Sequence, residues 1–385
     1  MKKIVFCFLG LLAVLYTASA QSYTFNHGPY LQELSEHAVT FVFTTSDKGF
    51  SWVEVKPDGG EAERHYTVRN GLRDAYNTFN VIRVENLRPD TRYQYRLCSK
   101  QIADFQPYKV TFGDSIVSPW RRFSTPDPKA TACSFIALSD MHQQPDKLGR
   151  LLNQAGVGSA DMIFYVGDMM NYYDNEETPF RSFIDKSVEL FASEKPFVLV
   201  RGNHETRGNM AREYARYVPK SSGKYYGAYR VGDIMFIVFD CGEDKPDDFW
   251  VYAGLTDFDG YRTEQAAWFG ELIRSKAYKS AKWRIVMNHF PPLSHMESDN
   301  PERHGIQDIT DKFLPLYNQA KIDLMISGHT HAYEFMSPDK YDRLTFPVIV
   351  NSTESVARID IDGRTLKAKV TDTGGNTLKE FTISK

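Results

Sequence analysis

Short apolar runs alternate with segments of helical periodicity from about residue 130 onwards. The runs are apolar at nearly every position, which is typical of strands buried on both faces of a sheet. They occupy residues 133–138, 162–166, 197–200, 234–239, 284–287, 322–326 and 346–350. Helical spacing of apolar residues predicts helices over 146–155, 178–192, 208–217, 263–276 (capped by Thr263) and 309–319. This alternation predicts an α/β domain.

The preceding residues, 23–125, have the pattern of an all-β domain instead. Apolar and polar residues alternate in 38–43 and in 51–55, and the turn-forming residues 47–49 lie between these two predicted strands. About seven short strands of this kind would form a β-sandwich. Alternation returns over 357–383, which predicts a hairpin that closes the α/β domain.

One motif in the all-β region sharpens its assignment. Residues 87–93 have the pattern L-x-P-x-T-x-Y, which resembles the turn of a fibronectin type III domain where the tyrosine hydroxyl bonds to upstream backbone. Pro126 and Pro128 then predict a linker, because two prolines so close resist both helix and sheet pairing. We therefore expect a fibronectin type III-like domain over 21–125, a linker over 126–130 and the α/β domain over 131–385.

The first twenty residues have the features of a signal peptide. Lys2 and Lys3 are followed by an apolar run over 4–15 and by the A-x-A pattern at 18–20. Cleavage after Ala20 would give a secreted or periplasmic protein, and an uncleaved anchor is the alternative. The rest of the chain has no apolar run of about 18 residues, so no membrane span is predicted after cleavage.

Charge and cysteine content exclude some functions. The formal charge is −3, and removing two lysines with the signal peptide makes it −5 (44 basic minus 49 acidic residues). A mildly acidic chain has no general attraction for nucleic acid, so we expect no nucleic-acid partner. The three cysteines after residue 20 lack the spacing of a metal site, and we expect buried thiols with at most one pair.

Polar motifs follow five of the apolar runs. They lie at 139–142, 167–168, 202–205, 288–289 and 328–331, and they hold five of the ten histidines in the chain. Any one of them is compatible with a hydrogen-bonded core residue. Five in succession, each at a strand end, indicate one site, because α/β folds place their sites in the loops that follow strands.

The residue types in these motifs suit metal ions. Histidine nitrogens with carboxylate and amide oxygens favour Zn, Mn or Fe over Ca and Mg. The candidate ligands are Asp140, His142, Asp168, Asn203, His289, His329 and His331. Seven ligands exceed the needs of one tetrahedral ion, so we expect two metal ions that share a carboxylate. Gly167, Gly202 and Gly328 would let the backbone turn sharply off each strand.

The order D-x-H, G-D, G-N-H-E, H and G-H-x-H resembles that of the calcineurin-like metallophosphoesterase superfamily. With the sandwich in front, residues 23–385 are similar to purple acid phosphatases. The resemblance implies two mixed sheets stacked face to face with helices outside. It also implies a dinuclear-metal-dependent hydrolase of phosphate esters in which a metal-bound hydroxide is the nucleophile.

The resemblance also implies a role for each ligand. The first metal ion would be held by Asp140, His142 and His331, and the second by Asn203, His289 and His329. Asp168 would bridge the two ions. His204 matches a histidine that is not a ligand and would act as general acid, or alternatively would only orient its neighbours. Glu205 and Arg201 would be structural.

One position departs from the purple acid phosphatase pattern. The tyrosine that binds the ferric ion would stand three positions after Asp168, where this chain has Asn171. We therefore expect no purple charge-transfer band, unless a shift in register lets Tyr172 bind the metal.

The substrate-binding residues are the least defined part. The aromatic and acidic insert 242–262 and the loop 291–305 are placed to border the site, and His295 and Arg303 are candidate phosphate contacts. A solvated loop is the alternative. We expect a phosphomonoesterase acting on a small-molecule, glycan-linked or nucleotide-linked phosphate ester. A phosphodiesterase or nucleotide hydrolase with the same centre is the alternative, and a non-catalytic secreted binding protein is the rival from another class.

Overall fold

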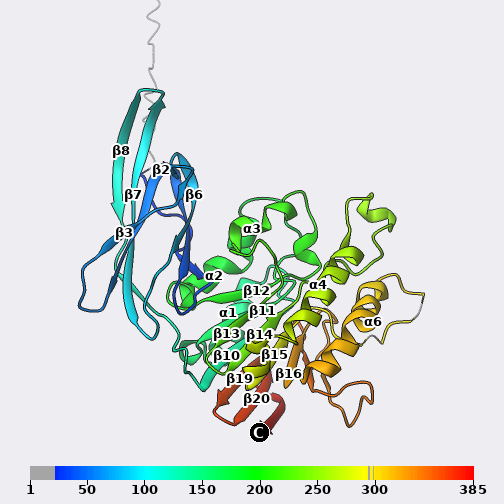
Figure 1. The fold of residues 1–385 in the computed structure, drawn as a ribbon. Coiled ribbons are helices and arrows are strands. Elements are labelled where there is room, and N and C mark those ends of the chain that lie inside the picture. Colours follow the sequence, from blue (N-terminus) through cyan, green and yellow to red (C-terminus); the bar gives the residue numbers. More distant parts are fainter. Residues whose placement is uncertain (1–21, 294, 298) are drawn as a thin grey trace, which may run out of the picture.

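The computed structural model describes residues 22–293, 295–297 and 299–385. A strand-rich N-terminal part stands beside a larger α/β part (Figure 1). The predicted signal peptide lies outside the described residues. Within the described ranges, no helix is long and apolar enough to cross a membrane.

The N-terminal part is rich in strands and is built around one long strand, β2. Its strands are β1 (Tyr30–Gln32), β2 (Val39–Pro57), β3 (Glu63–His65), β4 (Val68–Arg69), β5 (Leu72–Arg73), β6 (Asn77–Val84), β7 (Arg92–Gln106), β8 (Lys109–Val117) and β9 (Arg121–Ser124). The first half of β2 pairs with β1 and β6, and its second half pairs with β3 and β7. β2 thus belongs to both faces of a core that includes Phe41, Val53 and Tyr95.

The predicted turn at 47–49 is wrong. β2 runs through these residues, and its register against β6 shifts between Thr44 and Gly49. The turn-forming residues instead lie in a β-bulge within the strand. Thr45 Oγ1 donates to the Asp47 carbonyl at 2.8 Å and stabilises this bulge. The predicted tyrosine contact is present, since the Arg88 N–H donates to the Tyr93 hydroxyl at 2.8 Å.

The α/β part has two six-stranded mixed sheets, as the family resemblance implies. The first has the order β12 (Phe197–Val200), β11 (Met162–Val166), β10 (Ala132–Leu138), β19 (Ser355–Asp362), β20 (Thr365–Asp372) and β21 (Thr377–Ser384). The second has the order β13 (Gly227–Val231), β14 (Ile234–Val238), β15 (Trp283–Met287), β16 (Leu324–Ser327), β18 (Val348–Val350) and β17 (Glu334–Met336). The expected closing hairpin is two successive hairpins, because β20 pairs with both β19 and β21.

All seven predicted strands of this part are present, and their apolar character has the expected cause. Side chains such as Phe135 and Phe164 of the first sheet meet Phe236 and Ile285 of the second in a core between the sheets. The outer faces pack against helices in two further cores. Cys98, Cys133 and Cys241 are buried free thiols, as expected.

The helical segments cover the outer faces. They are α1 (Pro145–Gln154), η1 (Val157–Ser159), η2 (Phe180–Ile184), α2 (Asp185–Ser187), η3 (Val188–Ala192), η4 (His204–Thr206), η5 (Ala211–Glu213), α3 (Tyr214–Tyr217), η6 (Trp250–Tyr252), α4 (Phe258–Leu272), α5 (Lys276–Ser280) and α6 (Arg303–Ala320). The segments from η2 to η3 form the continuous helix predicted over 178–192. The helix predicted over 208–217 is shorter and consists of the single turns η5 and α3.

The predicted start of α4 is also wrong. Thr263 lies inside the helix, which begins at Phe258. The physical reason is a cap supplied from a distance. The Asp247 carboxylate accepts the N–H groups of Phe258 and Asp259, each at 2.8 Å, and so satisfies backbone donors at the helix start.

Candidate metal centre

The seven predicted ligands meet at one edge of the stacked sheets. Asp140 and His142 follow β10, Asp168 follows β11 and Asn203 follows β12. His289 follows β15, and His329 and His331 follow β16. Strands β10 to β12 are parallel, as are β15 and β16, so the carboxyl ends of each sheet lie at one edge and the stacking brings both sets together.

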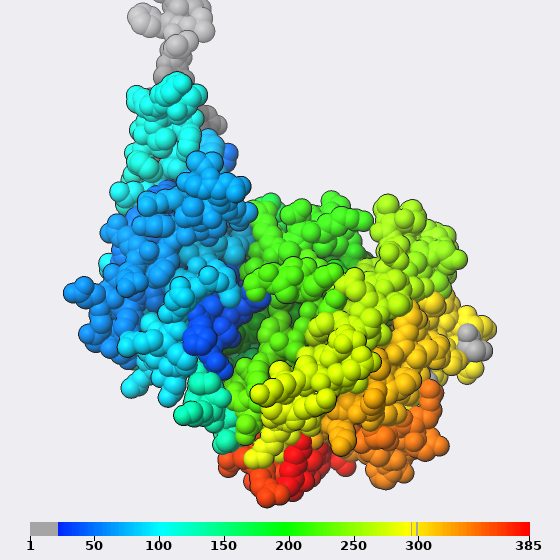
Figure 2. Space-filling view, viewed as in Figure 1, coloured from blue at the N-terminus to red at the C-terminus, as the bar shows by residue number. Residues whose placement is uncertain are grey.

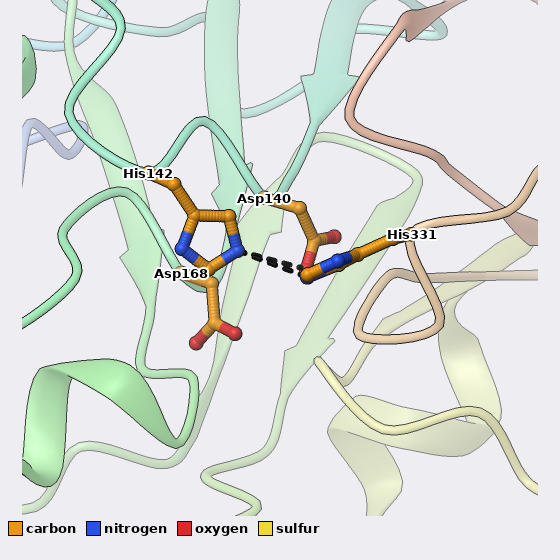
Figure 3. A group of neighbouring side chains, drawn as sticks. All are labelled: Asp140, His142, Asp168 and His331. Atoms are coloured by element: carbon orange, nitrogen blue, oxygen red, sulfur yellow. Dashed lines mark hydrogen bonds and ion pairs between the residues drawn. The ribbon is translucent and has the colours of Figure 1, made fainter.

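Two groups of side chains within this site have metal-binding spacing. One consists of Asp140, His142, Asp168 and His331, which face one another in Figure 3. The other consists of Asp168, His289 and His329. In each group the possible ligand atoms lie within 4.8 Å of one another, and Asp168 belongs to both. Asn203 joins the second group, since its Oδ1 lies 3.2 Å from His329 Nδ1.

The backbone is strained at most of these positions. Asp140, His142, Asp168, His329 and His331 all have left-handed φ angles, between 45° and 72°. Non-glycine residues rarely adopt this conformation, and it persists where surrounding structure enforces it, typically at functional sites. The strain turns each ligand sharply off its strand toward a common point.

The glycines in the motifs serve two different purposes. Gly167 has a φ of 88° and makes the predicted turn. Gly202 and Gly328 provide space: a Cβ on Gly202 would lie 2.2 Å from Asp168 Oδ1, and one on Gly328 would lie 2.4 Å from Asp140 Oδ2. These two positions therefore require glycine because a ligand carboxylate packs against the backbone.

Buried polar atoms show that the site suits a cation. His289 is fully buried, and its Nδ1 donates to the Val166 carbonyl at 2.7 Å. Its Nε2 lies 3.1 Å from the Asp168 carboxylate. This contact is favourable when Nε2 carries a proton, or when Nε2 and the carboxylate bind the same metal ion. His329 Nε2 is buried and has no hydrogen-bond partner in the described part of the chain. The donor set of imidazole, carboxylate and amide groups matches Zn, Mn or Fe.

The protonation states also favour metal binding. Burial lowers the pKa of His142 to about 4 and that of His329 to about 3, so both imidazoles are neutral at neutral pH. The pKa of His289 would be lowered by burial, but the Asp168 carboxylate raises it to about 10. Neutral imidazole is the form that binds metal, and a cation competes with the proton held between His289 and Asp168.

Glu205 fixes the loops that carry two of the ligands. Its fully buried carboxylate accepts the N–H groups of Asp168 (2.9 Å), Met169 (2.7 Å) and Gly202 (2.9 Å). Arg201 forms an ion pair with Asp240 at 2.8 Å. Both residues thus hold the frame of the site, which is the role expected of them.

His204 lies beside the two ligand groups. Its backbone N–H donates to Asp168 Oδ1 at 3.0 Å, and its ring centroid lies 4.7 Å from that of His142. Nδ1 donates to the Asn171 carbonyl at 2.8 Å, which leaves Nε2 as the acceptor, 3.1 Å from Arg207 Nη1. His331, whose side chain is 53% exposed, marks the side on which the site opens to solvent.

The calcineurin-like phosphoesterase family model matches residues 133–333, just over half of the 385 residues. This chain belongs to the calcineurin-like phosphoesterase family. The matched range includes all seven residues of the two ligand groups and His204. Family membership therefore rests on the α/β part of the chain.

Several curated relatives of this chain are purple acid phosphatases. It is 22% identical to purple acid phosphatase 21 of Arabidopsis thaliana over 277 residues, which cover 68% of this chain and 55% of that protein. It is 22% identical to a purple acid phosphatase of Glycine max over 352 residues, which cover 84% and 70% respectively. The chain spans about half the length of most of the curated relatives it matches.

Solved structures show the same fold. The purple acid phosphatase PPD1 of yellow lupin superposes with a TM-score of 0.67 at 14% identity, covering 92% of this chain and 74% of that one. PhoD superposes with a TM-score of 0.61 at 12% identity, covering 92% and 89%. Both likenesses extend through the sandwich and the α/β part.

Asn171, three positions after Asp168, contacts two histidines of the candidate site. Its Oδ1 lies 3.1 Å from His142 Nδ1, and its carbonyl accepts from His204. Tyr172 is 58% exposed, and its ring centroid lies 6.3 Å from that of His204. The absence of a purple charge-transfer band stays a prediction.

The two proposed phosphate contacts lie apart from the ligand groups. His295 is exposed and pairs with Glu334 at 3.2 Å. Arg303 donates to the Met296 carbonyl (3.2 Å) and to Gln307 (3.1 Å) near the start of α6. Within the described part of the chain, neither side chain forms a hydrogen bond or ion pair with any of the seven predicted ligands.

Sequence reasoning did not find Arg207. This residue lies three positions after His204, just beyond the single turn of η4. Side chains three positions apart lie on the same side of a 3₁₀ turn, so the spacing of Arg207 from His204 was the available signal that their side chains are neighbours.

Proposed function

We propose that this phosphoesterase is a secreted phosphomonoesterase that works with two metal ions held at the strand ends. One observation carries the proposal: two ligand groups of metal-binding spacing share the Asp168 carboxylate. A shared carboxylate is the usual bridge between paired metal ions in hydrolases.

The ligand roles follow the two groups. Asp140, His142 and His331 would hold one ion. Asn203, His289 and His329 would hold the other, with Asp168 between them. Such a pair of Fe, Mn or Zn ions, when bound, supplies a nucleophile from water at neutral pH and neutralises charge on the phosphoryl oxygens.

The protein residues position the substrate and move the proton. The fixed tautomer of His204 directs Nε2 away from the Asn171 carbonyl that anchors its ring. We assign Nε2 to the leaving-group oxygen, where a protonated imidazole would act as general acid. His331 and the exposed side of the site would admit the ester.

The N-terminal sandwich is proposed as a fibronectin type III-like domain over 21–125, with a linker over 126–130. The bond from Arg88 N–H to the Tyr93 hydroxyl supports this assignment. The proposed secretion rests on the sequence of residues 1–20 and is tested by N-terminal sequencing of the exported protein. A first residue of Gln21 would support it, and a retained Met1 would contradict it.

The first test combines metal content with substrate preference. We expect elemental analysis of the purified protein to find about two metal ions per chain, and an aryl phosphate to be hydrolysed faster than a bis-aryl phosphodiester. Faster turnover of the diester would favour the phosphodiesterase alternative. A protein without metal, inactive after addition of Mn, Zn or Fe, would favour a non-catalytic binding protein.

A variant of the second ligand group tests whether metal content and turnover are lost together. We expect His289→Ala to lose metal from that group and to abolish turnover, since its Nε2 faces the shared carboxylate. His37→Ala is the matched control, because His37 lies in the sandwich and bonds to the Leu87 carbonyl. Equal metal content and activity in both variants would contradict the ligand assignment.

A further inference from the structure

A cleft of about 810 Å³ lies next to the metal centre. Its walls come from residues 201–212 and 223–225 on one side and from the insert 243–261 on the other. Figure 2 shows the surface hollowed between the green and yellow-green regions that hold these segments. Tyr225, Tyr252 and Phe258 give the cleft an aromatic lining, and Arg207 lies in the wall nearest His204.

Two carboxylates orient the Arg207 guanidinium. Its Nε and Nη2 donate to the Glu243 carboxylate at 3.1 and 2.9 Å, and Nη2 also donates to Asp244 at 3.1 Å. This forked contact fixes the plane of the guanidinium. The remaining nitrogen, Nη1, points to the centre and lies 3.1 Å from His204 Nε2.

The carboxylates are themselves held in place. Glu243 is 2% exposed and accepts from the Thr206 hydroxyl at 2.7 Å and from the Tyr252 hydroxyl at 3.0 Å. Arg207, at 24% side-chain exposure, therefore keeps a defined position while part of its surface faces the cleft. A charge held in this way needs little reorganisation when it meets an anion.

Arg207 Nη1 has a weak partner that a substrate can replace. Its partner is the uncharged lone pair of His204 Nε2 at 3.1 Å, an atom that lies 3.9 Å from Asp168 Oδ2 in the shared carboxylate. An anionic phosphate oxygen forms a stronger, charge-assisted hydrogen bond with a guanidinium than a neutral nitrogen does. A phosphoryl group at the centre would thus meet Nη1 beside His204.

We propose that Arg207 is a specificity-determining residue that selects phosphate monoesters by binding a terminal phosphoryl oxygen. A monoester presents one more anionic terminal oxygen than a diester does, so a fixed positive charge stabilises the monoester preferentially. The aromatic cleft beyond Arg207 would receive the leaving group. This inference rests on the proposed function and extends it to the choice of substrate.

A purely structural role for Arg207 makes a different prediction. Asp244 also accepts from the Asn203 amide at 3.3 Å, so Arg207 reaches a proposed ligand through Asp244. If Arg207 acted only through this connection, its loss would reduce metal content and slow both classes of substrate equally. The ratio of the two rates separates the roles.

The test compares kcat/KM for an aryl phosphate and a bis-aryl phosphodiester in Arg207→Met, with metal content measured on the same samples. We expect monoester hydrolysis to fall about 10²- to 10³-fold, as when one charge-stabilising donor is removed, with the diester rate changed by less than about fivefold. Arg207→Lys should recover part of the loss, because it restores charge without the fork. Metal content should stay at the wild-type value.

Arg343→Met is the control. Arg343 is exposed and lies outside the cleft, and no ion pair or hydrogen bond is found for its side chain within the described ranges. We expect this variant to keep both rates. An unchanged monoester-to-diester ratio in Arg207→Met, or loss of metal from it, would overturn the inference alone. A wild-type protein that hydrolyses neither ester, or that prefers the diester, would overturn the proposed monoesterase as well.

Discussion

Asp168 is the residue on which the centre depends most. It belongs to both ligand groups, its Oδ2 lies 3.1 Å from His289 Nε2, and its Oδ1 accepts the backbone N–H of His204. Burial by itself raises the pKa of this carboxyl, but His289 and the neighbouring histidines hold it well below its usual range. Asp168 therefore carries a negative charge at neutral pH, and a cation bound beside it would be stabilised.

His204→Ala should separate catalysis from metal binding. The backbone N–H of His204 donates to Asp168 Oδ1 and is retained in the variant, so we expect the variant to keep its metal ions. We expect turnover of an aryl phosphate to fall about 10²- to 10⁴-fold, the usual contribution of a general acid. Metal content and kcat are measured together, and metal loss matching the loss of turnover would refute the assigned role.

Gly328→Ala tests the need for close packing at a ligand. The added Cβ would lie 2.4 Å from Asp140 Oδ2 and 2.3 Å from Ser139 Oγ, so Asp140 would have to move. We expect reduced metal content and a loss of about 1–3 kcal/mol in the free energy of unfolding. Gly158→Ala is the control, because its Cβ would meet no atom within 4 Å. Wild-type metal content in Gly328→Ala would contradict the packing argument.

At the scale of elements, short polar contacts hold segments that are distant in sequence. Glu205 joins the loops after β11 and β12, and Asp247 caps α4. Just before β1, His27 contacts the helical segment that begins with η2: its ring stacks on Phe180 at 3.9 Å, and its Nδ1 lies 2.9 Å from Asp185. Glu205, Asp247 and His27 are titratable, so the hydrogen bonds and ion pairs of these side chains depend on pH.

The contact of His27 should depend on pH in a defined direction. Burial lowers the pKa of His27, but hydrogen bonding to Asp185 and the nearby Glu177 raise it overall above 6.5. A raised folded-state pKa stabilises the protein fully below the unfolded value and ceases to do so as pH rises through the folded value.

We therefore expect His27→Gln to cost about 0.5–1 kcal/mol of unfolding free energy near pH 5.5, a small value because both acidic partners are about half exposed. The cost should shrink by about pH 8. Urea unfolding of both proteins at the two pH values measures it. A cost that is equal at both, or larger at the higher pH, would contradict the assignment.

At the scale of the whole molecule, the strand-rich N-terminal part and the α/β part share a core. Tyr30 and Val42 of the N-terminal part belong to the hydrophobic cluster that includes Phe197 and Leu199 of β12. The Tyr30 hydroxyl donates to the Tyr217 carbonyl at 2.7 Å, and Tyr95 donates to the Ser193 carbonyl at 2.6 Å. We expect the two parts to unfold together.

Tyr30→Ala should destabilise both parts at once. The side chain is fully buried and stacks on Phe197 at 5.7 Å, so truncation removes an aromatic ring from the shared core. We expect a loss of about 3–5 kcal/mol in a single unfolding transition. Tyr108→Ala, at a fully exposed position on the β7–β8 hairpin, should change stability by less than about 0.5 kcal/mol. Two separate transitions in calorimetry, with one unmoved, would show independent parts.

The sequence by itself determined the order of elements and the chemistry of the site. The run Met162–Val166 is apolar throughout because β11 is buried between two layers, and its predicted bounds are those of the strand. Asp168 and His289 follow such runs, and parallel strands bring their ends to one edge. These features depend on local periodicity and residue type, which a chain displays without its fold.

Only the tertiary structure decided features that depend on distant partners. Thr263 has the chemistry of a cap, but Asp247 supplies the cap from a loop, so α4 starts earlier. Arg207 lies three positions after His204, but this spacing does not show which groups its guanidinium contacts. Its guanidinium is held by Glu243, 36 residues away in the sequence, and this contact places Nη1 beside His204 Nε2. Such contacts arise when packing places segments side by side, because the free energy of a polar pair depends on separation in space and not along the chain.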